Sequence, residues 1–247
     1  MLTEKRQGII LELLREKKSV TVAEIKDRLG ISESTIRRDL NALDREGKLT
    51  KVFGGAVVLD PPVLSAELSV PQKLRVNEGE KRCIARYAAS IIRPNDFVYL
   101  DAGTTTGYML EYPMERNVTF VTNAVDHARR LAVAGYRALL VGGELRGTTE
   151  AVVGAQAILS IQEYHFTLGF FGTNGISRRH GCTTPDSSEA LVKKTALRRC
   201  GKPYVLADSA KFDEVSSVSF AGFHEVKIIS ERIPDGYGEC ENVCLAQ

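Results

Sequence analysis

The chain has 247 residues, 43% hydrophobic and 26% charged, which is enough to bury the core of one large domain or of two smaller ones. It has no apolar run near the roughly 18 residues of a membrane helix and no apolar signal segment at its start, so we expect a cytoplasmic protein. The net charge of +2 is uneven, because residues 1–58 carry 12 Lys and Arg against 9 Asp and Glu, whereas residues 59–247 carry 21 against 22. The more basic N-terminal part suits a polyanionic partner.

Two short helices are predicted in the first 30 residues. Apolar residues recur at helical spacing between Thr3 and Lys17. Thr21 and Glu24 then have the spacing of a capping box, and Gly30 can end the second helix in a left-handed conformation. We expect the inner face of this second helix to hold Ala23, Ile25 and Leu29.

A third helix is predicted after a short turn. Ser32 is placed to cap it and Gly47 to close it, while Ile36, Leu40 and Leu43 form an apolar stripe at i, i+4 and i+7. Two helices joined by such a Gly-containing turn form a helix-turn-helix, whose second helix enters the major groove of DNA.

The face opposite this stripe carries groups that bind phosphates and base edges. At about 100° per residue, Ser34, Arg38 and Asn41 point away from the core, with Thr35 and Arg37 on the flanks. Two β-like runs around Gly-Gly, residues 48–53 and 56–59, predict a hairpin that would act as a wing. The residues predicted to contact DNA are Ser32, Ser34, Thr35, Arg37, Arg38, Asn41, Arg45, Lys48 and Lys51.

Residues 1–58 are therefore expected to form a winged helix-turn-helix, with a protein-interaction module of three helices as the alternative. The stretches that point to a family are residues 20–24, 32–40, 47–50 and 53–56. They resemble the DNA-binding signature of the DeoR family of bacterial repressors. This resemblance implies a sequence-specific repressor that binds double-stranded operator DNA.

A linker is expected over residues 59–76, because Asp60-Pro61-Pro62 interrupts the β pattern. From residue 77 to 247 a helix is followed by short apolar runs that alternate with small polar residues and helices. This alternation predicts an α/β domain with a doubly wound, mostly parallel sheet. The apolar runs are residues 97–100, 118–121, 138–141, 166–171, 204–207 and 227–229.

Ligands of such sheets bind in the crevice at the carboxyl ends of the strands. There, residues 103–106 offer backbone N–H groups and hydroxyls at the start of a helix, which favours a phosphate over a plain strand-end turn. The chain has no P-loop motif, and residues 169–175 do not match the dinucleotide fingerprint. Residues 101–105 look like the phosphate loop of actin-like sugar kinases, but a domain of this length lacks their two large lobes.

The second domain also resembles the sensor of the DeoR family, which is similar in fold to ribose-5-phosphate isomerase and the CoA-transferases. The matching residues are 101–106, 122–123, 142–145, 171–172, 174–175, 183–186, 189–190 and 208–211. The resemblance implies a sugar-phosphate effector that releases the repressor from DNA. A closer likeness to repressors of fructose operons in Gram-positive bacteria, over residues 97–106, 165–174 and 183–193, implies fructose 1-phosphate.

The crevice and the resemblance together predict the effector-binding residues. They are Asp101, Gly103, Thr104, Thr105, Thr106, Thr122, Asn123, Gly142, Gly143, Gly172, Asn174, Asp186, Glu189, Lys193, Asp208 and Lys211.

The alternative function is a sugar-phosphate isomerase, because Asp186, Glu189 and Lys193 are of the right types for proton transfer. Glu189 and Lys193 are equally explained by an i,i+4 surface salt bridge or by hydrogen bonds to sugar hydroxyls. A DNA-binding domain in the same chain favours sensing, so no catalytic residue is assigned.

No cofactor and no metal are expected. The five cysteines are scattered, and Cys240 with Cys244 lacks the neighbouring His of a zinc site. A homo-oligomer, dimer or tetramer, is expected because one small helix-turn-helix rarely gives enough affinity for an operator.

Overall fold

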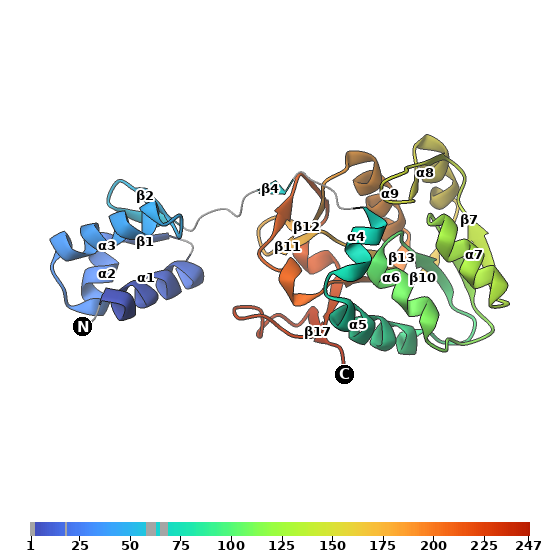
Figure 1. Cartoon of the computed structure of the whole chain (residues 1–247), viewed down its shortest axis with the longest axis horizontal. Coiled ribbons are helices and arrows are strands. Elements are labelled where there is room, and N and C mark those ends of the chain that lie inside the picture. Colours follow the sequence, from blue (N-terminus) through green and yellow to red (C-terminus); the bar gives the residue numbers. More distant parts are fainter. Residues whose placement is uncertain (1–2, 18, 58–62, 65–68) are drawn as a thin grey trace. The chain divides into compact units, whose positions relative to one another are not determined.

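The computed structural model describes residues 3–17, 19–57, 63–64 and 69–247 (Figure 1). Its contacts divide the chain into two compact units, residues 1–61 and 62–247, each with its own hydrophobic core. The Asp60-Pro61-Pro62 segment and the end of the second wing strand lie outside the described residues. Within the described ranges, every helix is too short or too polar to cross a membrane.

The first unit packs three helices against a small antiparallel sheet of strand order β1-β3-β2. Its core is formed by apolar side chains of all three helices, including the fully buried Ile10, Ile25 and Leu40. The predicted helix-turn-helix and its wing are thus present, and β1 adds a strand that the sequence analysis did not foresee. The elements are α1 (Thr3–Lys17), β1 (Ser19–Thr21), α2 (Val22–Leu29), α3 (Glu33–Arg45), β2 (Thr50–Val52) and β3 (Gly55–Val57).

The predicted caps of α2 and α3 are present. Thr21 and Glu24 form the capping box, Gly30 ends α2 with a φ of 63°, and Ser32 accepts a hydrogen bond from the backbone N–H of Thr35. The predicted inner face of α2 was partly wrong, because Ala23 is exposed. In its place Val22 is buried together with Ile25, since residues three apart share one helix face.

A buried ion pair joins α1 to α3. Asp39 on α3 is only 2% exposed. Its carboxylate accepts two hydrogen bonds from the guanidinium of Arg6 on α1. One of them, from Nη2 to Oδ1, measures 2.8 Å. Such a bidentate contact fixes direction as well as distance, so it orients α3 on the rest of the unit.

The second unit is built on a seven-stranded parallel sheet of order β17-β16-β13-β10-β5-β6-β7. The predicted mostly parallel sheet is confirmed, and the edge strand β17 was not predicted. A separate antiparallel sheet of order β11-β12-β15 was not predicted. The strands of the large sheet are β5 (Phe97–Leu100), β6 (Thr119–Thr122), β7 (Arg137–Leu140), β10 (Phe166–Gly172), β13 (Cys200–Leu206), β16 (Lys227–Ser230) and β17 (Val243–Leu245). The small sheet contains β11 (Gly175–Ser177), β12 (Gly181–Thr184) and β15 (Val218–Ala221).

Helices cover both faces of the large sheet, which is the doubly wound arrangement. Successive residues of β5 point to opposite faces: Tyr99 belongs to one core cluster, and Val98 and Leu100 belong to the other. The first cluster includes residues of α8 and α9, and the second includes residues of α5, α6 and α7. These helices are α5 (Glu78–Ile91), α6 (Thr104–Tyr108), α7 (Val125–Val133), α8 (Ala155–Gln162) and α9 (Ser187–Arg198).

Part of the expected linker is structured. Within residues 59–76, strand β4 (Val63–Leu64) pairs with β14 (Val215–Ser216), and α4 (Val70–Arg75) packs on the second unit. The backbone N–H of Val70 donates to the carbonyl of Thr148, and the Tyr108 hydroxyl donates to the carbonyl of Leu74. Residues 70–75 therefore belong to the second unit. Pro71 is compatible with α4 because the first helical turn needs no hydrogen bond from its nitrogen.

The wing sheet depends on a close backbone approach at Gly55. A Cβ built there would lie 2.1 Å from the carbonyl oxygen of Val20, so Gly55→Ala must push β1 and β3 apart. We expect this substitution to destabilise the first unit by about 1–3 kcal/mol, the usual cost of overpacking. The measurement is urea unfolding of the whole chain followed by circular dichroism. Gly8→Ala is the control, because a Cβ at helical Gly8 meets nothing within 4 Å, and unfolding of Gly55→Ala at the wild-type urea concentration would contradict the assignment.

Candidate functional site

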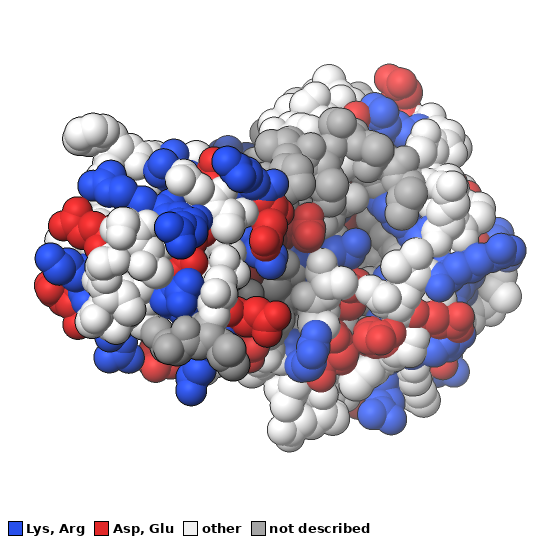
Figure 2. Space-filling model, turned by 60° about the vertical axis from the view of Figure 1, so that its left-hand side comes forward, with Lys and Arg blue, Asp and Glu red and all other residues white. Residues whose placement is uncertain are grey.

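One face of α3 is exposed and polar. Ile36, Leu40 and Leu43 are fully buried, and the opposite side presents the predicted contact residues to solvent. Figure 2 shows Lys and Arg side chains gathered over the first unit, with Asp and Glu among them. The exposed predicted residues are Ser32, Ser34, Arg37, Arg38, Asn41, Arg45, Lys48 and Lys51, whereas Thr35 is half-buried.

Some residues of this face already form hydrogen bonds within the described parts of the protein, and others do not. The Ser32 hydroxyl caps α3, and Lys51 on the wing donates a 2.6 Å hydrogen bond to the side-chain oxygen of Asn41, which joins wing and helix. Arg38 and Arg45 have no carboxylate partner among the described residues. Their guanidinium groups are therefore available to an external anion or base.

The wing tip carries a residue that the sequence analysis did not single out. Phe53 is fully exposed just before Gly54, whose φ of 82° makes the turn between β2 and β3. This exposed ring lies on the same wing as Lys51. Its position next to the Gly-Gly turn was the signal that could have identified it.

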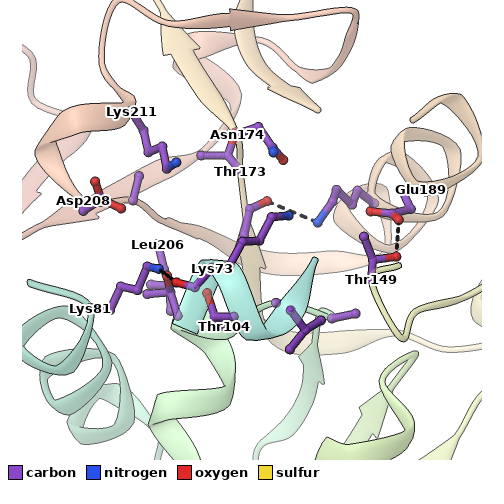
Figure 3. Close-up of a pocket in the computed structure, with 17 residues that line it drawn as sticks. Lys73, Lys81, Thr104, Thr149, Thr173, Asn174, Glu189, Leu206, Asp208 and Lys211 are labelled. Atoms are coloured by element: carbon purple, nitrogen blue, oxygen red, sulfur yellow. Dashed lines mark hydrogen bonds between the residues drawn. The ribbon is translucent and has the colours of Figure 1, made fainter. Parts of the chain in front are cut away.

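A pocket lies at the carboxyl ends of β5, β10 and β13, where the predicted crevice was placed (Figure 3). Loops after these strands form its floor, α9 lies at one side, and α4 contributes Val70 and Lys73. The pocket is lined by Val70, Lys73, Lys81, Ala102, Gly103, Thr104, Thr105, Thr149, Gly172, Thr173, Asn174, Glu189, Lys193, Leu206, Ala207, Asp208 and Lys211.

Nine of the predicted effector residues line this pocket: Gly103, Thr104, Thr105, Gly172, Asn174, Glu189, Lys193, Asp208 and Lys211. The other seven do not line it, and some of them hold neighbouring backbone. Asn123 accepts from the backbone N–H of Ala102, and Thr106 donates to the carbonyl of Asp101. The predicted residues that do not line the pocket are Asp101, Thr106, Thr122, Asn123, Gly142, Gly143 and Asp186.

The local backbone explains the residue type at some of the predicted positions that do not line the pocket. Gly143 has a φ of 145°, and a Cβ there would lie 2.4 Å from the carbonyl of Val153. Asp186 caps α9 by accepting from the backbone N–H of Glu189. Polar residues at strand ends thus hold the loops as often as they face the pocket.

A buried ion pair organises the floor of the pocket. The ammonium of Lys193 on α9 donates to the carboxylate of Asp101 at the end of β5 and, at 3.2 Å, to the carbonyl of Gly172. Burial raises the pKa of Asp101, and the neighbouring Lys193 opposes this rise. The same carboxylate accepts from the backbone N–H of Gly172, so β5, β10 and α9 are tied together at one point.

The surface salt bridge considered between Glu189 and Lys193 is wrong. Both residues are buried, at 8% and 5% exposure, and each has another partner. Lys193 pairs with Asp101, and Glu189 accepts a 2.5 Å hydrogen bond from the hydroxyl of Thr149.

Two lysines of the pocket were missed by the sequence analysis. Lys73 fell in the expected linker, and no role was predicted for Lys81. Lys81 in fact lies three, four and seven residues before the buried Ile84, Ala85 and Ala88, on the inward face of α5. A lysine in phase with an apolar stripe was the available signal.

The pocket holds an excess of positive charge. Four lysines line it, against the carboxylates of Glu189 and Asp208 and that of Asp101, which pairs with Lys193. Burial lowers the pKa of Lys73 to about 8, with Lys193 as the next cause. Burial also lowers the pKa of Lys81, which Asp208 opposes. Protonated ammonium groups so placed are costly in the absence of an anion, and a bound anion offsets that cost.

Metal ligands do not gather anywhere in the described parts of the chain, where no group of three or more His, Cys, Asp or Glu could hold an ion. Cys182 is buried, and burial raises the pKa of its thiol to about 12. It therefore acts as a small apolar side chain.

Comparison with known proteins gives matches over both units. Residues 6–61 match the family model of the DeoR-like helix-turn-helix domain, and residues 76–232 match that of the DeoR C-terminal sensor domain. An uncharacterised helix-turn-helix transcriptional regulator of Bacillus subtilis, FruR, is 37% identical over 231 residues, which are 93% of this chain and 91% of that protein. The lactose phosphotransferase system repressor of Staphylococcus aureus is 32% identical over 228 residues, covering 91% and 90%.

Solved structures resemble the chain more distantly. Ribose 5-phosphate isomerase A from Neisseria gonorrhoeae is 14% identical with a TM-score of 0.40, over 56% of this chain and 54% of that one. The delta subunit of eIF2B from Chaetomium thermophilum is 17% identical with a TM-score of 0.45, over 64% and 57%.

The Asp101–Lys193 pair predicts a strong effect of removing one partner. Lys193→Met leaves a buried carboxylate without its ammonium, and we expect the second unit to lose about 3–5 kcal/mol of unfolding free energy. The double variant Asp101→Asn/Lys193→Met removes both charges and should regain much of this loss. Urea unfolding of the four chains of this double-mutant cycle measures the coupling, and additive effects of the two substitutions would show that the pair is not coupled.

Proposed function

Since this chain belongs to the DeoR family of helix-turn-helix regulators, we propose that it represses a sugar-utilisation operon and is released from its operator by a phosphorylated sugar. The observation that carries the proposal is the pocket lined by Lys73, Lys81, Lys193 and Lys211 at the carboxyl ends of a parallel sheet. Ammonium groups bind a phosphate as point charges. The relatives named as regulators of transcription and of a sugar phosphotransferase system support the same function.

The other side of the pocket suits a polyol. Thr149 and Glu189 are hydrogen-bonded to each other, and Asn174 also lines the pocket (Figure 3). Hydroxyl, amide and carboxylate groups form directional hydrogen bonds to sugar hydroxyls, and a sugar that leaves them unpaired binds poorly. Among phosphorylated sugars we place fructose 1-phosphate first, because of the close likeness to fructose operon repressors.

The first unit supplies the DNA contacts in this proposal. Arg37 and Arg38, early on α3, meet base edges in the major groove, and Arg45 with Lys48 and Lys51 meets backbone phosphates. Two or four copies of the chain place their α3 helices on paired half-sites. The effector releases the operator because it binds more tightly to a form of the oligomer whose DNA-binding units do not fit that spacing.

Turnover of the bound sugar is not part of the proposal. Glu189 and Lys193, the residues of suitable type for an isomerase, are held by Thr149 and Asp101 respectively. We assign them to binding and to the shape of the pocket. No cofactor is needed for this role.

Arg38→Ala should weaken operator binding. The loss of one bidentate contact to a base costs about 1–3 kcal/mol and relaxes the preference at one operator position. Fluorescence anisotropy with labelled operator at fixed salt measures both effects. Arg86→Ala, which removes an exposed arginine of the second unit, is the control for lost charge, and equal affinity of the two variants would refute the orientation of α3.

Phosphorylated sugars should raise the melting temperature, and their unphosphorylated forms should do so far less, because only the former carry the anion that the lysines bind. The measurement is a thermal-shift titration with fructose 1-phosphate, other sugar phosphates and free fructose. Equal shifts with fructose and fructose 1-phosphate would refute the anion argument. A shift with a different sugar phosphate alone would refute only the choice of fructose 1-phosphate.

A further inference from the structure

The tip of the wing carries a residue that its turn does not require. Val52 pairs with Gly55, so the turn between β2 and β3 consists of Phe53 and Gly54 alone. Such two-residue turns favour Asn, Asp or Gly, and Gly54 supplies the left-handed conformation with a φ of 82°. Phe53 is nevertheless fully exposed, and it is the most exposed large apolar residue among those that the structure describes. A ring that neither the turn nor the core uses is available to a partner.

The wing holds this tip at a fixed place relative to α3. The backbone N–H of Lys51 donates to the carboxylate of Asp44 at 2.8 Å, and its ammonium donates to the side-chain oxygen of Asn41 at 2.6 Å. At the turn itself, the carbonyl of Gly54 accepts from the backbone N–H of Val22 at 2.8 Å. The ring is therefore presented by a tethered hairpin, and its position follows that of the helix that reads DNA in the proposed function.

The surface that presents the ring is cationic. Exposed cations lie on α3, just after it and on β2: Arg38, Arg45, Lys48 and Lys51. Glu46, a carboxylate of the same segment, is engaged by Lys48 at 2.7 Å. Cores of protein–protein interfaces are poor in charged residues, whereas proteins that enter the minor groove of DNA combine cations with an apolar wedge. The combination favours a groove of DNA over an apolar protein surface.

The tether to α3 determines which groove the ring can reach. Because the N-terminal residues of such a helix contact the bases, its C-terminal half, with Asn41 and Asp44, lies toward the phosphate backbone that borders the major groove. The hairpin tied to these two residues then reaches across that backbone. The groove beyond it is a minor groove.

We propose that Phe53 enters the minor groove beside the half-site read by α3 and wedges between two base pairs. The inference rests on the proposed function and adds a DNA-contacting residue and the kind of base step that it selects. A phenyl ring has no hydrogen-bonding group, so it reads how easily a step opens rather than the edges of its bases. Pyrimidine–purine steps, TA and CA/TG, open most easily and are therefore expected at this position of the operator.

The wedge also strengthens the contacts of α3. Apolar wedges in the minor groove bend the duplex toward the major groove. Such a bend brings the phosphates that border the major groove toward Arg45 and Lys48, at and just after the end of α3. Closer phosphate contacts thus offset the cost of unstacking one step. The sequence of that step changes the affinity although no side chain forms a hydrogen bond to it.

The experiment uses the full chain and a duplex that the wild-type chain selects from a random pool. Phe53→Ala and Phe53→Leu are compared with Val52→Ala, which shortens the exposed apolar neighbour on the same wing. Fluorescence anisotropy should show about tenfold weaker binding of Phe53→Ala, the loss typical of one contact between a base and an aromatic ring. Phe53→Leu and Val52→Ala should bind nearly as wild type does. Because the ring is fully exposed, Phe53→Ala should unfold at the wild-type urea concentration.

Readouts on the DNA distinguish a wedge from other contacts. The base analogue aminopurine fluoresces when it is unstacked, and it is placed in turn at the steps that flank the half-site. It should brighten at one step with wild type and Phe53→Leu but not with Phe53→Ala, and energy transfer between the duplex ends should show a smaller bend with Phe53→Ala. Replacing that step with a stiff A-tract should weaken binding of wild type and leave that of Phe53→Ala nearly unchanged.

The possible outcomes distinguish the wedge from the proposed function. If the wild-type chain selects no sequence from the pool, the proposed function fails. If it selects one and Phe53→Ala matches Val52→Ala in affinity, bend and aminopurine signal, only the wedge is refuted. If Phe53→Ala instead changes the oligomeric state of the free chain in sedimentation, the ring packs on a second copy and the wedge is likewise refuted.

Discussion

The pocket depends on the contact between Lys193 and Asp101. One carboxylate oxygen accepts from the Lys193 ammonium and from the backbone N–H of Gly172, and the same ammonium reaches the Gly172 carbonyl. An end of β5, an end of β10 and the middle of α9 therefore meet at one ion pair that is almost wholly buried. Buried pairs rarely increase net stability over apolar residues of equal size, but they fix a geometry. Here the fixed geometry is that of the loops that line the pocket.

Lys73 and Lys81 in the pocket lower the stability of the fold, because their charged ammonium groups are poorly solvated. Lys81 and Lys73 are buried or half-buried, and burial lowers the pKa of each because the charged form is poorly solvated. A chain selected for stability alone would place apolar residues there. In the proposed function a bound anion supplies the missing solvation, so charges that lower the stability of the fold would raise the affinity for that anion.

The first unit was predictable from sequence because its determinants are local. The capping box at Thr21, the left-handed Gly30 and the cap at Ser32 each act within four residues, and all are present. The parallel sheet was predictable for the same reason, since each buried strand is a short apolar run. The Arg6–Asp39 and Asp101–Lys193 pairs join residues far apart in the chain, and nothing local in the sequence marks these partners. Lys73 was not predicted as a pocket residue because Asp60-Pro61-Pro62 suggested a linker up to residue 76, whereas residues 70–75 form α4.

The predicted site contained residues that hold loops as well as residues that line the pocket. The two groups differ in whether the backbone uses their hydrogen-bonding groups. Every parallel strand ends with backbone groups that need partners, so polar residues gather there whether or not a ligand binds. Asn123 uses both ends of its amide on the backbone of Ala102 and Val152, which leaves it little capacity for a ligand. Lys81, in contrast, is a cation on the apolar face of a helix, and its ammonium donates to a backbone carbonyl. A residue that breaks the local rule for its element, such as Lys81, is thus a better guide to the pocket than a polar residue that merely follows a strand.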